Sequence, residues 1–206
     1  MTRQKRIKQY LISTITKSET RNQKPETMRK TYPSFIPFPK IPRLFKECVI
    51  TEKIDGTNGL IHITGTGDFF VGSRNRWLTE ESDNHGFRQW AMENKDELMK
   101  LGVGSHHGEW WGSGIQRGYN LPEGEKRFSL FNASVWNESN KPTSCHVVPT
   151  LYIGEFSTTA IEGVMDRLKD HGSYASSGFM NPEGIIAYHM AAGKYFKVPF
   201  DKNHKG

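Results

Sequence analysis

A lysine lies between two carboxylates in the stretch EKIDGTNG, residues 52–59. Lys53 follows an apolar run and stands just before an Asp-Gly turn, with Glu52 and Asp55 on either side. A lysine that attacks the α-phosphate of a nucleotide must be neutral, which burial or neighbouring cations favour. The attack also needs cations and a metal to neutralise the phosphoryl oxygens. The ordinary alternative is a surface lysine on a hairpin, paired with Glu52 or Asp55.

The other groups that this chemistry requires follow downstream, each in its own short motif. They include an arginine, a carboxylate for ribose hydroxyls, aromatic rings, a second carboxylate and two lysines. In chain order they are Arg74 in GSRNRW, Glu109 in HHGEWWGSGIQRGY, Phe128 and Phe131 in RFSLFN, Glu183 in NPEGIIAYH, and Lys194 and Lys197 in AAGKYFKVPF.

Each of these residues also has an ordinary structural interpretation. Arg74 and Arg76 could be solvated side chains on an exposed turn. Glu109 could form a buried pair with a nearby arginine such as Arg117, and Glu183 could cap a turn.

The aromatic and histidine pairs are constrained by strand geometry. Phe128 and Phe131 are three positions apart on a strand-like segment, so they face opposite sides and at least one belongs to the core. Adjacent residues also point opposite ways on a strand, which disfavours a metal shared by His106 and His107 and favours structural roles for both.

Taken together, EKIDGTN, GSRNRW, HGEWWGSGIQRGY, RFSLFN and PEGI make the chain resemble the covalent nucleotidyltransferase superfamily of ATP-dependent ligases and capping enzymes. Within it, the chain is similar to bacteriophage RNA ligases of the RNA ligase 2 type, over about residues 32–206. The resemblance implies a single α+β, antiparallel-rich nucleotidyltransferase (adenylation) domain. It also implies that ATP is used with Mg²⁺ or Mn²⁺, and that RNA ends, including those of a nicked duplex, are the partners in RNA repair.

The resemblance assigns roles to the motif residues. Lys53 would attack the ATP α-phosphate to give a covalent lysyl-AMP, Lys197 would contact that phosphate, and Asn58 would serve the later joining of a 3′-OH to an adenylylated 5′-phosphate end. Phe131 would stack on adenine while Phe128 lies behind it in the core. Nucleotide contacts would come from Glu52, Arg74, Glu109, Phe131, Lys194 and Lys197, and the metal contact from Glu183.

The last motif departs from the family pattern, in which two lysines stand one residue apart. Lys197 is followed by Val198 and Pro199, so the second phosphate contact would come from Lys194, Lys202 or Lys205, or be missing.

The chain ends nine residues after Lys197, so we expect no C-terminal accessory or OB domain, and self-adenylylation is a firmer expectation than efficient end-joining. Two rival functions stay open: a DNA ligase or GTP-dependent capping-type core, and a non-catalytic nucleic-acid-binding module.

The elements that must position these residues can be predicted from patterning. Prolines make residues 32–45 extended, and alternation predicts most of the strands. A 3.6-residue apolar period predicts a helix over 84–101, and a second helix over 157–172 has a Ser or Thr cap and a closing glycine. Strands are expected at 48–54, 59–64, 68–72, 184–189 and 194–198. Residues 104–111 and 126–136 are predicted to be β-rich, and residues 146–156 to contain another strand.

The distribution of charge separates a tail from the body. The chain of 206 residues has a net charge of +6, and residues 1–27 hold seven Lys or Arg and two Glu, so +5 of it lies there. These residues lack a sustained apolar period, which predicts a basic, disordered tail before one domain at 28–206. Without a run of about eighteen apolar residues or a secretory signal, we expect no membrane contact and a cytoplasmic location, in a host cell if the protein is viral. We also expect a monomer. Cys48 and Cys145 are expected to be reduced core thiols.

Overall fold

A computed structural model describes residues 33–200 of the chain. The chain divides into two units between Ile41 and Pro42. In the first unit, the described residues 33–41 form no helix or strand and are exposed, as the prolines of this segment predict. The predicted tail at 1–27 and the predicted domain start at 28 lie outside the described residues. All the described helices and strands belong to the second unit.

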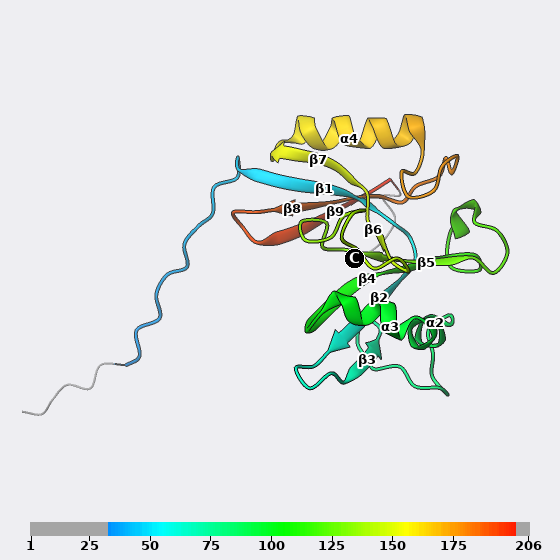
Figure 1. Cartoon of the computed structure of the whole chain (residues 1–206). Helices are drawn as coiled ribbons and strands as arrows, with labels where there is room; N and C mark the ends of the chain where they lie inside the picture. The colour runs from blue at the N-terminus through cyan, green and yellow to red at the C-terminus, as the bar shows by residue number, and fades with distance from the viewer. Residues whose placement is uncertain (1–32, 201–206) are drawn as a thin grey trace, which may run out of the picture. The chain divides into compact units, whose positions relative to one another are not determined.

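A four-stranded antiparallel sheet, here called sheet A, carries α4 on one face (Figure 1). Its strand order is β7 (Thr150–Glu155), β1 (Glu47–Lys53), β8 (Gly184–His189) and β9 (Lys194–Pro199). The helix α4 (Thr158–His171) begins where predicted, because the Ser157 hydroxyl accepts a hydrogen bond from the Ala160 N–H at 3.1 Å. The core between helix and sheet is made of Cys48, Ile50, Val164, Leu168, Ile185 and Ala187.

A second sheet of five strands, here called sheet B, packs against the shorter helices. Its order is β3 (Phe69–Gly72), β2 (Thr57–Ile63), β4 (Gly104–Gly112), β5 (Lys126–Leu130) and β6 (His146–Val147), and only β5 and β6 are parallel. One face of sheet B and the helices α2 (Phe87–Glu93) and α3 (Lys95–Leu98) enclose the largest core cluster, which includes Ile61, Phe87, Leu98, Trp110 and Phe128.

The chain passes directly from sheet A to sheet B through residues 54–56. β1 ends at Lys53 and β2 starts at Thr57, so the predicted nucleophile lies at the junction of the two sheets. A third core cluster supports this junction, and it contains Ile54, Trp111, Tyr119, Val148 and Phe179.

Two predicted elements are shorter in the structure than in the sequence analysis. The helix predicted over 84–101 is divided at Asn94, whose side-chain amide donates to the Trp90 carbonyl at 2.8 Å, and it continues as α3 and the 3₁₀ helix η1 (Met99–Leu101). Within the segment 126–136, which is predicted to be β-rich, the strand β5 stops at Leu130. Residues 131–136 turn, with the Ser134 hydroxyl donating to the Asn132 side chain at 2.6 Å.

The second unit is therefore an antiparallel-rich α+β domain, as the sequence predicts. Cys48 and Cys145 are both buried and unpaired, which agrees with the expectation of core thiols. Among residues 33–200, no helix is long and apolar enough to cross a membrane.

Candidate active site

Lys53 extends from the last position of β1 and pairs with the carboxylate of Glu183, which stands directly before the neighbouring strand β8. Its Nζ donates to Oε2 of Glu183 at 2.5 Å, and the register of β1 and β8 places Lys53 opposite Gly184. The Lys53 side chain is 24% exposed and that of Glu183 is 6% exposed. The amine therefore lies beside a buried carboxylate while it remains accessible from outside.

The pairing of Lys53 with Glu52 or Asp55, which the sequence leaves open, does not occur. Successive residues of β1 face opposite sides of sheet A, so Glu52 points into the protein whereas Lys53 points out. Asp55 pairs with Arg117, whose Nε donates to Oδ2 at 2.9 Å.

Glu109 lies on β4 directly opposite Asn58 of β2 and is bonded to the turn that follows Lys53. Its Oε1 accepts from the Gly56 N–H and its Oε2 from the Asn58 amide, both at 3.1 Å. Glu109 is 8% exposed, and this burial raises its pKa to about 7, against the opposing effects of the Lys53 charge and of the two hydrogen bonds. The structure thus holds a carboxylate that titrates near neutral pH close to the candidate nucleophile.

Asn58 connects Glu109 to Arg74. The side-chain oxygen of Asn58 accepts from Nε of Arg74 at 2.9 Å, while its amide nitrogen donates to Glu109. Arg74 is exposed but is fixed by this bond, whereas Arg76 binds the Ser82 carbonyl at 2.9 Å on the other side of its loop. Of the two arginines that could have been merely solvated, Arg74 thus joins the candidate site.

Phe128 and Phe131 occupy the two environments that strand geometry predicts. Phe128 is fully buried in the core of sheet B, and Phe131 is 41% exposed. The Phe131 N–H donates to the His107 carbonyl at 3.0 Å, which extends the strand pairing by one residue beyond β5. Phe131 therefore lies on the face of sheet B that carries Glu109, where its ring is free to meet a base.

The two lysines of the last motif lie on opposite faces of β9. Lys197 is directly opposite Ile186 of β8, which is in turn directly opposite Thr51 of β1. Because Thr51 and Lys53 are two residues apart on β1, Lys197 lies on the face of sheet A that carries Lys53. Lys194 pairs with His189 and faces the side of α4. Both are exposed, and Lys202 and Lys205 lie outside the described residues.

Glu52 is not brought together with the other candidate residues. It is 1% exposed, and its carboxylate accepts from the Ser173 hydroxyl at 2.6 Å and from the Tyr174 and Ala175 N–H groups at 2.8 and 3.0 Å. Burial raises its pKa despite these donors. The carboxylate ties β1 to the loop that follows α4.

Two residues to which the sequence assigns no role in the site position the turn after Lys53. The Tyr119 hydroxyl accepts from the Asp55 N–H at 2.8 Å, and Arg117 binds the Asp55 carboxylate. Both belong to the GIQRGY stretch that already marks the family pattern. Tyr119 is fully buried and has a positive φ of 52°, so it occupies a constrained position.

A divalent metal would find few protein ligands here. Residues 33–200 contain no group of three or more His, Cys, Asp or Glu that could hold a metal ion. An ion of the magnesium type commonly uses one or two carboxylates and completes its shell with substrate phosphates and water. Glu183, whose carboxylate is bonded to Lys53, is the residue that could bind such an ion.

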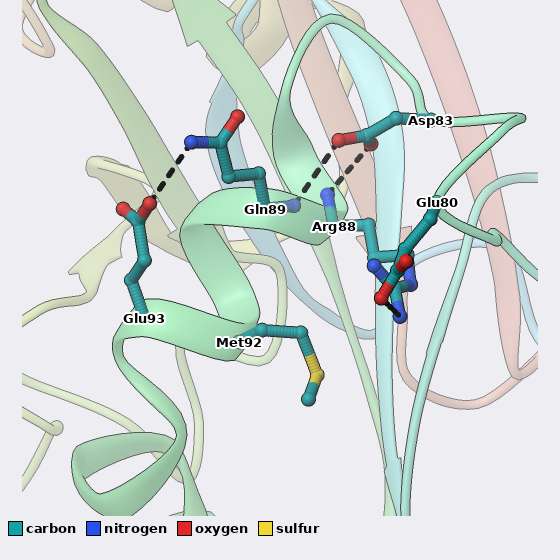
Figure 2. A pocket seen from close by; sticks show the side chains of 6 residues that line it. All are labelled: Glu80, Asp83, Arg88, Gln89, Met92 and Glu93. Carbon is teal, nitrogen blue, oxygen red and sulfur yellow. Dashed lines mark hydrogen bonds and ion pairs between the residues drawn. The ribbon is translucent and has the colours of Figure 1, made fainter.

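A hollow on the described surface lies away from these residues. It measures about 390 Å³ beside α2 and is lined by Glu80, Asp83, Arg88, Gln89, Met92 and Glu93 (Figure 2). The Asp83 carboxylate in it accepts from the Arg88 and Gln89 N–H groups at 2.7 and 3.1 Å, so it caps the start of α2. No candidate site residue lines this hollow.

Comparison with known proteins bears on the family. A family model described as RNA ligase matches residues 46–198. No curated protein matches. The fold is similar to that of a Naegleria gruberi RNA ligase with PPi, at 21% identity and a TM-score of 0.56, covering 82% of this chain and 57% of that chain. A mutant of a Naegleria gruberi RNA ligase with ATP and Mn gives 19% identity and a TM-score of 0.54, covering 74% of this chain and 48% of that chain.

These likenesses to solved structures concern the fold, and the chain spans about half the length of the structures it matches. The family model covers the whole segment from β1 to β9, including Lys53, Glu109 and Glu183. By that match, the chain belongs to the RNA ligase family.

Proposed function

We propose that the protein is an ATP-dependent RNA ligase that works through a covalent lysyl-AMP on Lys53. The observation that carries the proposal is the position of Lys53 at the junction of the two sheets, with Glu183 at 2.5 Å. Beside it, hydrogen bonds connect Glu109 on β4, Asn58 on β2 and Arg74 in the loop after β3. The family match supports RNA as the substrate class.

In the first step, the Lys53 amine attacks the α-phosphate of ATP. An ammonium has no lone pair, so its proton must leave first, and the Glu183 carboxylate is placed to accept it. The new N–P bond forms as the bond to the β-phosphate breaks, and pyrophosphate leaves. Phe131 is exposed on the Glu109 face for stacking on adenine, and Lys197 is exposed on the Lys53 face for contact with the phosphate.

In the next steps the AMP leaves Lys53 for an RNA end. An oxygen of a 5′-phosphate attacks the lysine-bound phosphorus, and Lys53 recovers its amine. A 3′-OH then attacks the 5′-phosphate phosphorus, a phosphodiester forms, and AMP departs. Arg74 and Asn58 stand exposed or half-buried beside Glu109 and are the groups we assign to these later steps. A bound Mg²⁺ or Mn²⁺, held by Glu183 and phosphate oxygens, would neutralise charge on the transferring group.

The test is the intact mass of the purified full chain after incubation with Mg²⁺ and ATP, and separately with GTP. We expect the gain of one AMP from ATP, its loss in Lys53→Ala, and its retention in Lys169→Ala, which removes an exposed lysine of α4. Circular dichroism checks that Lys53→Ala is folded.

Three results would contradict the proposal. A Lys53→Ala protein that still gains AMP would refute the assignment of the nucleophile. A gain from GTP alone would indicate a capping-type enzyme. No gain from either nucleotide, in folded protein stripped of bound AMP, would indicate a nucleic-acid-binding module without catalysis.

A further inference from the structure

Three neighbouring rings lie at the surface of the outer end of sheet B. They belong to His62 on β2, Phe70 on β3 and Trp77 just after β3, and we call them the aromatic platform. Their centroids are 5.6 Å apart for Phe70 and Trp77, 6.0 Å for His62 and Trp77, and 6.3 Å for His62 and Phe70. Phe70 is 44% exposed and Trp77 is 53% exposed. The rings thus contact one another, while the two larger ones leave much of their surface open.

The platform is built by strand register and by a tight loop. His62 and Phe70 are directly opposite each other on β2 and β3. The chain then reverses through residues 73–76, with the Ser73 N–H donating to the Arg76 carbonyl at 2.8 Å, and a bridge pairs Gly72 with Trp77. A Cβ added at Gly72 would lie 3.1 Å from the indole, so the missing side chain is what lets Trp77 pack over the strand.

The platform continues the face of sheet B that holds the candidate active site. Asn58, Leu60 and His62 alternate along β2 and point to one side, while Ile61 and Ile63 point into the core. The loop that fixes Trp77 also carries Arg74, which binds Asn58 at 2.9 Å. One short loop therefore connects the candidate site to the platform.

The platform adds little to the core, which lies on the opposite face. Val71 and Leu78, the neighbours of Phe70 and Trp77 in sequence, are both buried in that core. Exposed aromatic side chains beside arginines are suited to single-stranded nucleic acid, because bases stack on the rings and the guanidinium groups attract the phosphates. A nucleotide bound at Lys53 uses one base, and Phe131 is the ring available to it, so the platform is open to a different base.

We propose that the aromatic platform stacks on one base of the RNA strand close to the end being joined, while Arg74 lies toward the active site. This inference rests on the proposed RNA ligase function, since it assigns to the substrate strand a binding site next to the joining reaction. Trp77 provides the largest exposed ring and is the main contact.

The first test measures the binding of a short fluorescein-labelled single-stranded RNA with a 5′-phosphate and a 3′-OH. We expect Trp77→Ala to raise Kd about 5- to 150-fold, the range found when a stacking ring is removed, and Trp77→Phe to restore most of the affinity. The slope of log K against log salt stays the same in Trp77→Ala, because a neutral ring releases no counterions. The matched control is Phe45→Ala, which removes an exposed aromatic ring, 65% accessible, from outside sheet B.

The second test changes the RNA and compares wild type with Trp77→Ala. A series of RNAs carries one abasic residue at successive positions from each end. We expect one position at which loss of the base weakens binding to wild type, and we expect Trp77→Ala to be insensitive at that same position. The wild-type measurement tests the proposal even if a platform variant folds poorly.

Covalent AMP formation separates the two proposals. Trp77→Ala should gain AMP as wild type does, because Trp77 lies outside the group around Lys53. If wild type gains no AMP, the proposed function fails whatever the RNA data show. If wild type gains AMP but binds every abasic RNA equally well, or if Trp77→Ala binds RNA as tightly as wild type, the platform is a structural cluster and the inference is wrong.

Discussion

Glu109 is a buried carboxylate whose charge costs the folded protein free energy. Burial raises its pKa from an ordinary value of 4.5 to about 7, so well below pH 4.5 it is protonated in both the folded and the unfolded chain. As pH rises toward 7, the unfolded chain loses this proton more readily than the folded one. The contribution of this group to the free energy of unfolding is therefore fully present at low pH. It is lost as pH rises through about 7, and the free energy of unfolding then falls by up to about 3 kcal/mol.

A Glu109→Gln variant should lack this dependence while keeping an oxygen for the Gly56 N–H. We expect its free energy of unfolding, relative to wild type, to increase by about 2–3 kcal/mol between pH 5 and pH 7.5. Urea unfolding at the two pH values measures the difference. Glu162→Gln, on the exposed side of α4, is the matched control and should follow wild type. Parallel pH profiles for Glu109→Gln and wild type would show that the carboxylate is not buried as described.

Most of the candidate site residues can be chosen from the sequence, but their partners cannot. Asn58, Arg74 and Glu109 stand out as polar residues inside short motifs. The partner of Lys53 is Glu183, which is 130 positions away in the chain, so no local pattern connects the two. The nearer carboxylates are excluded by strand alternation and by Arg117, and these are effects of the folded arrangement.

The β1–β2 connection is the element that places Lys53, and Gly56 is its tightest point. The sequence suggests that glycine serves the turn, but Gly56 is not among the glycines with positive φ. Its importance is close packing, because an added Cβ would lie 2.4 Å from the Trp110 carbonyl oxygen and 2.8 Å from Cβ of Trp111. The backbone of β4 therefore leaves no space for a side chain there.

Gly56→Ala should destabilise the protein by about 1–3 kcal/mol, since β1 or β4 must shift to admit the methyl group. The same shift moves Lys53 and Glu109 apart, so covalent AMP formation should fall even where the variant is folded. Gly65→Ala is the matched control: it lies after β2 with no atom within 4 Å of the new Cβ, and its effect should stay within about 0.5 kcal/mol. Equal stability of the two variants in urea would contradict the packing argument.

The strands and the capped helix α4 are predicted well from the sequence, because alternation and capping are local signals. The continuous helix predicted over 84–101 follows from an apolar period that includes Phe87, Trp90, Ala91, Leu98 and Leu101, although polar Asn94 and Lys95 occupy the turn between Ala91 and Leu98. The helix divides there because the Asn94 side chain bonds to a backbone carbonyl and competes with helix continuation, an effect that the apolar period alone does not reveal. Sheet membership is equally hidden, since β1 and β2 are neighbours in sequence but belong to different sheets.

For the whole molecule, charge and chemistry are separated along the chain. Residues 1–27 carry +5 of the net charge of +6, and every candidate site residue lies between Glu52 and Lys197. Attraction to RNA that arises from those basic residues depends on salt, whereas nucleotide transfer at Lys53 depends on local geometry.

Removal of residues 1–27 should therefore leave covalent AMP formation unchanged and weaken RNA binding at low salt. The slope of log K against log salt should become shallower, by about 0.7 for each phosphate of a single strand that the protein no longer neutralises. A full-length variant with the seven Lys and Arg of this segment changed to Gln separates charge from length, and it should match the truncation. If a folded truncation failed to gain AMP, the tail would contribute to the chemistry. If both variants kept the wild-type salt slope, the phosphates would be bound by the body of the protein, where Arg74 and Lys197 are exposed on the candidate faces.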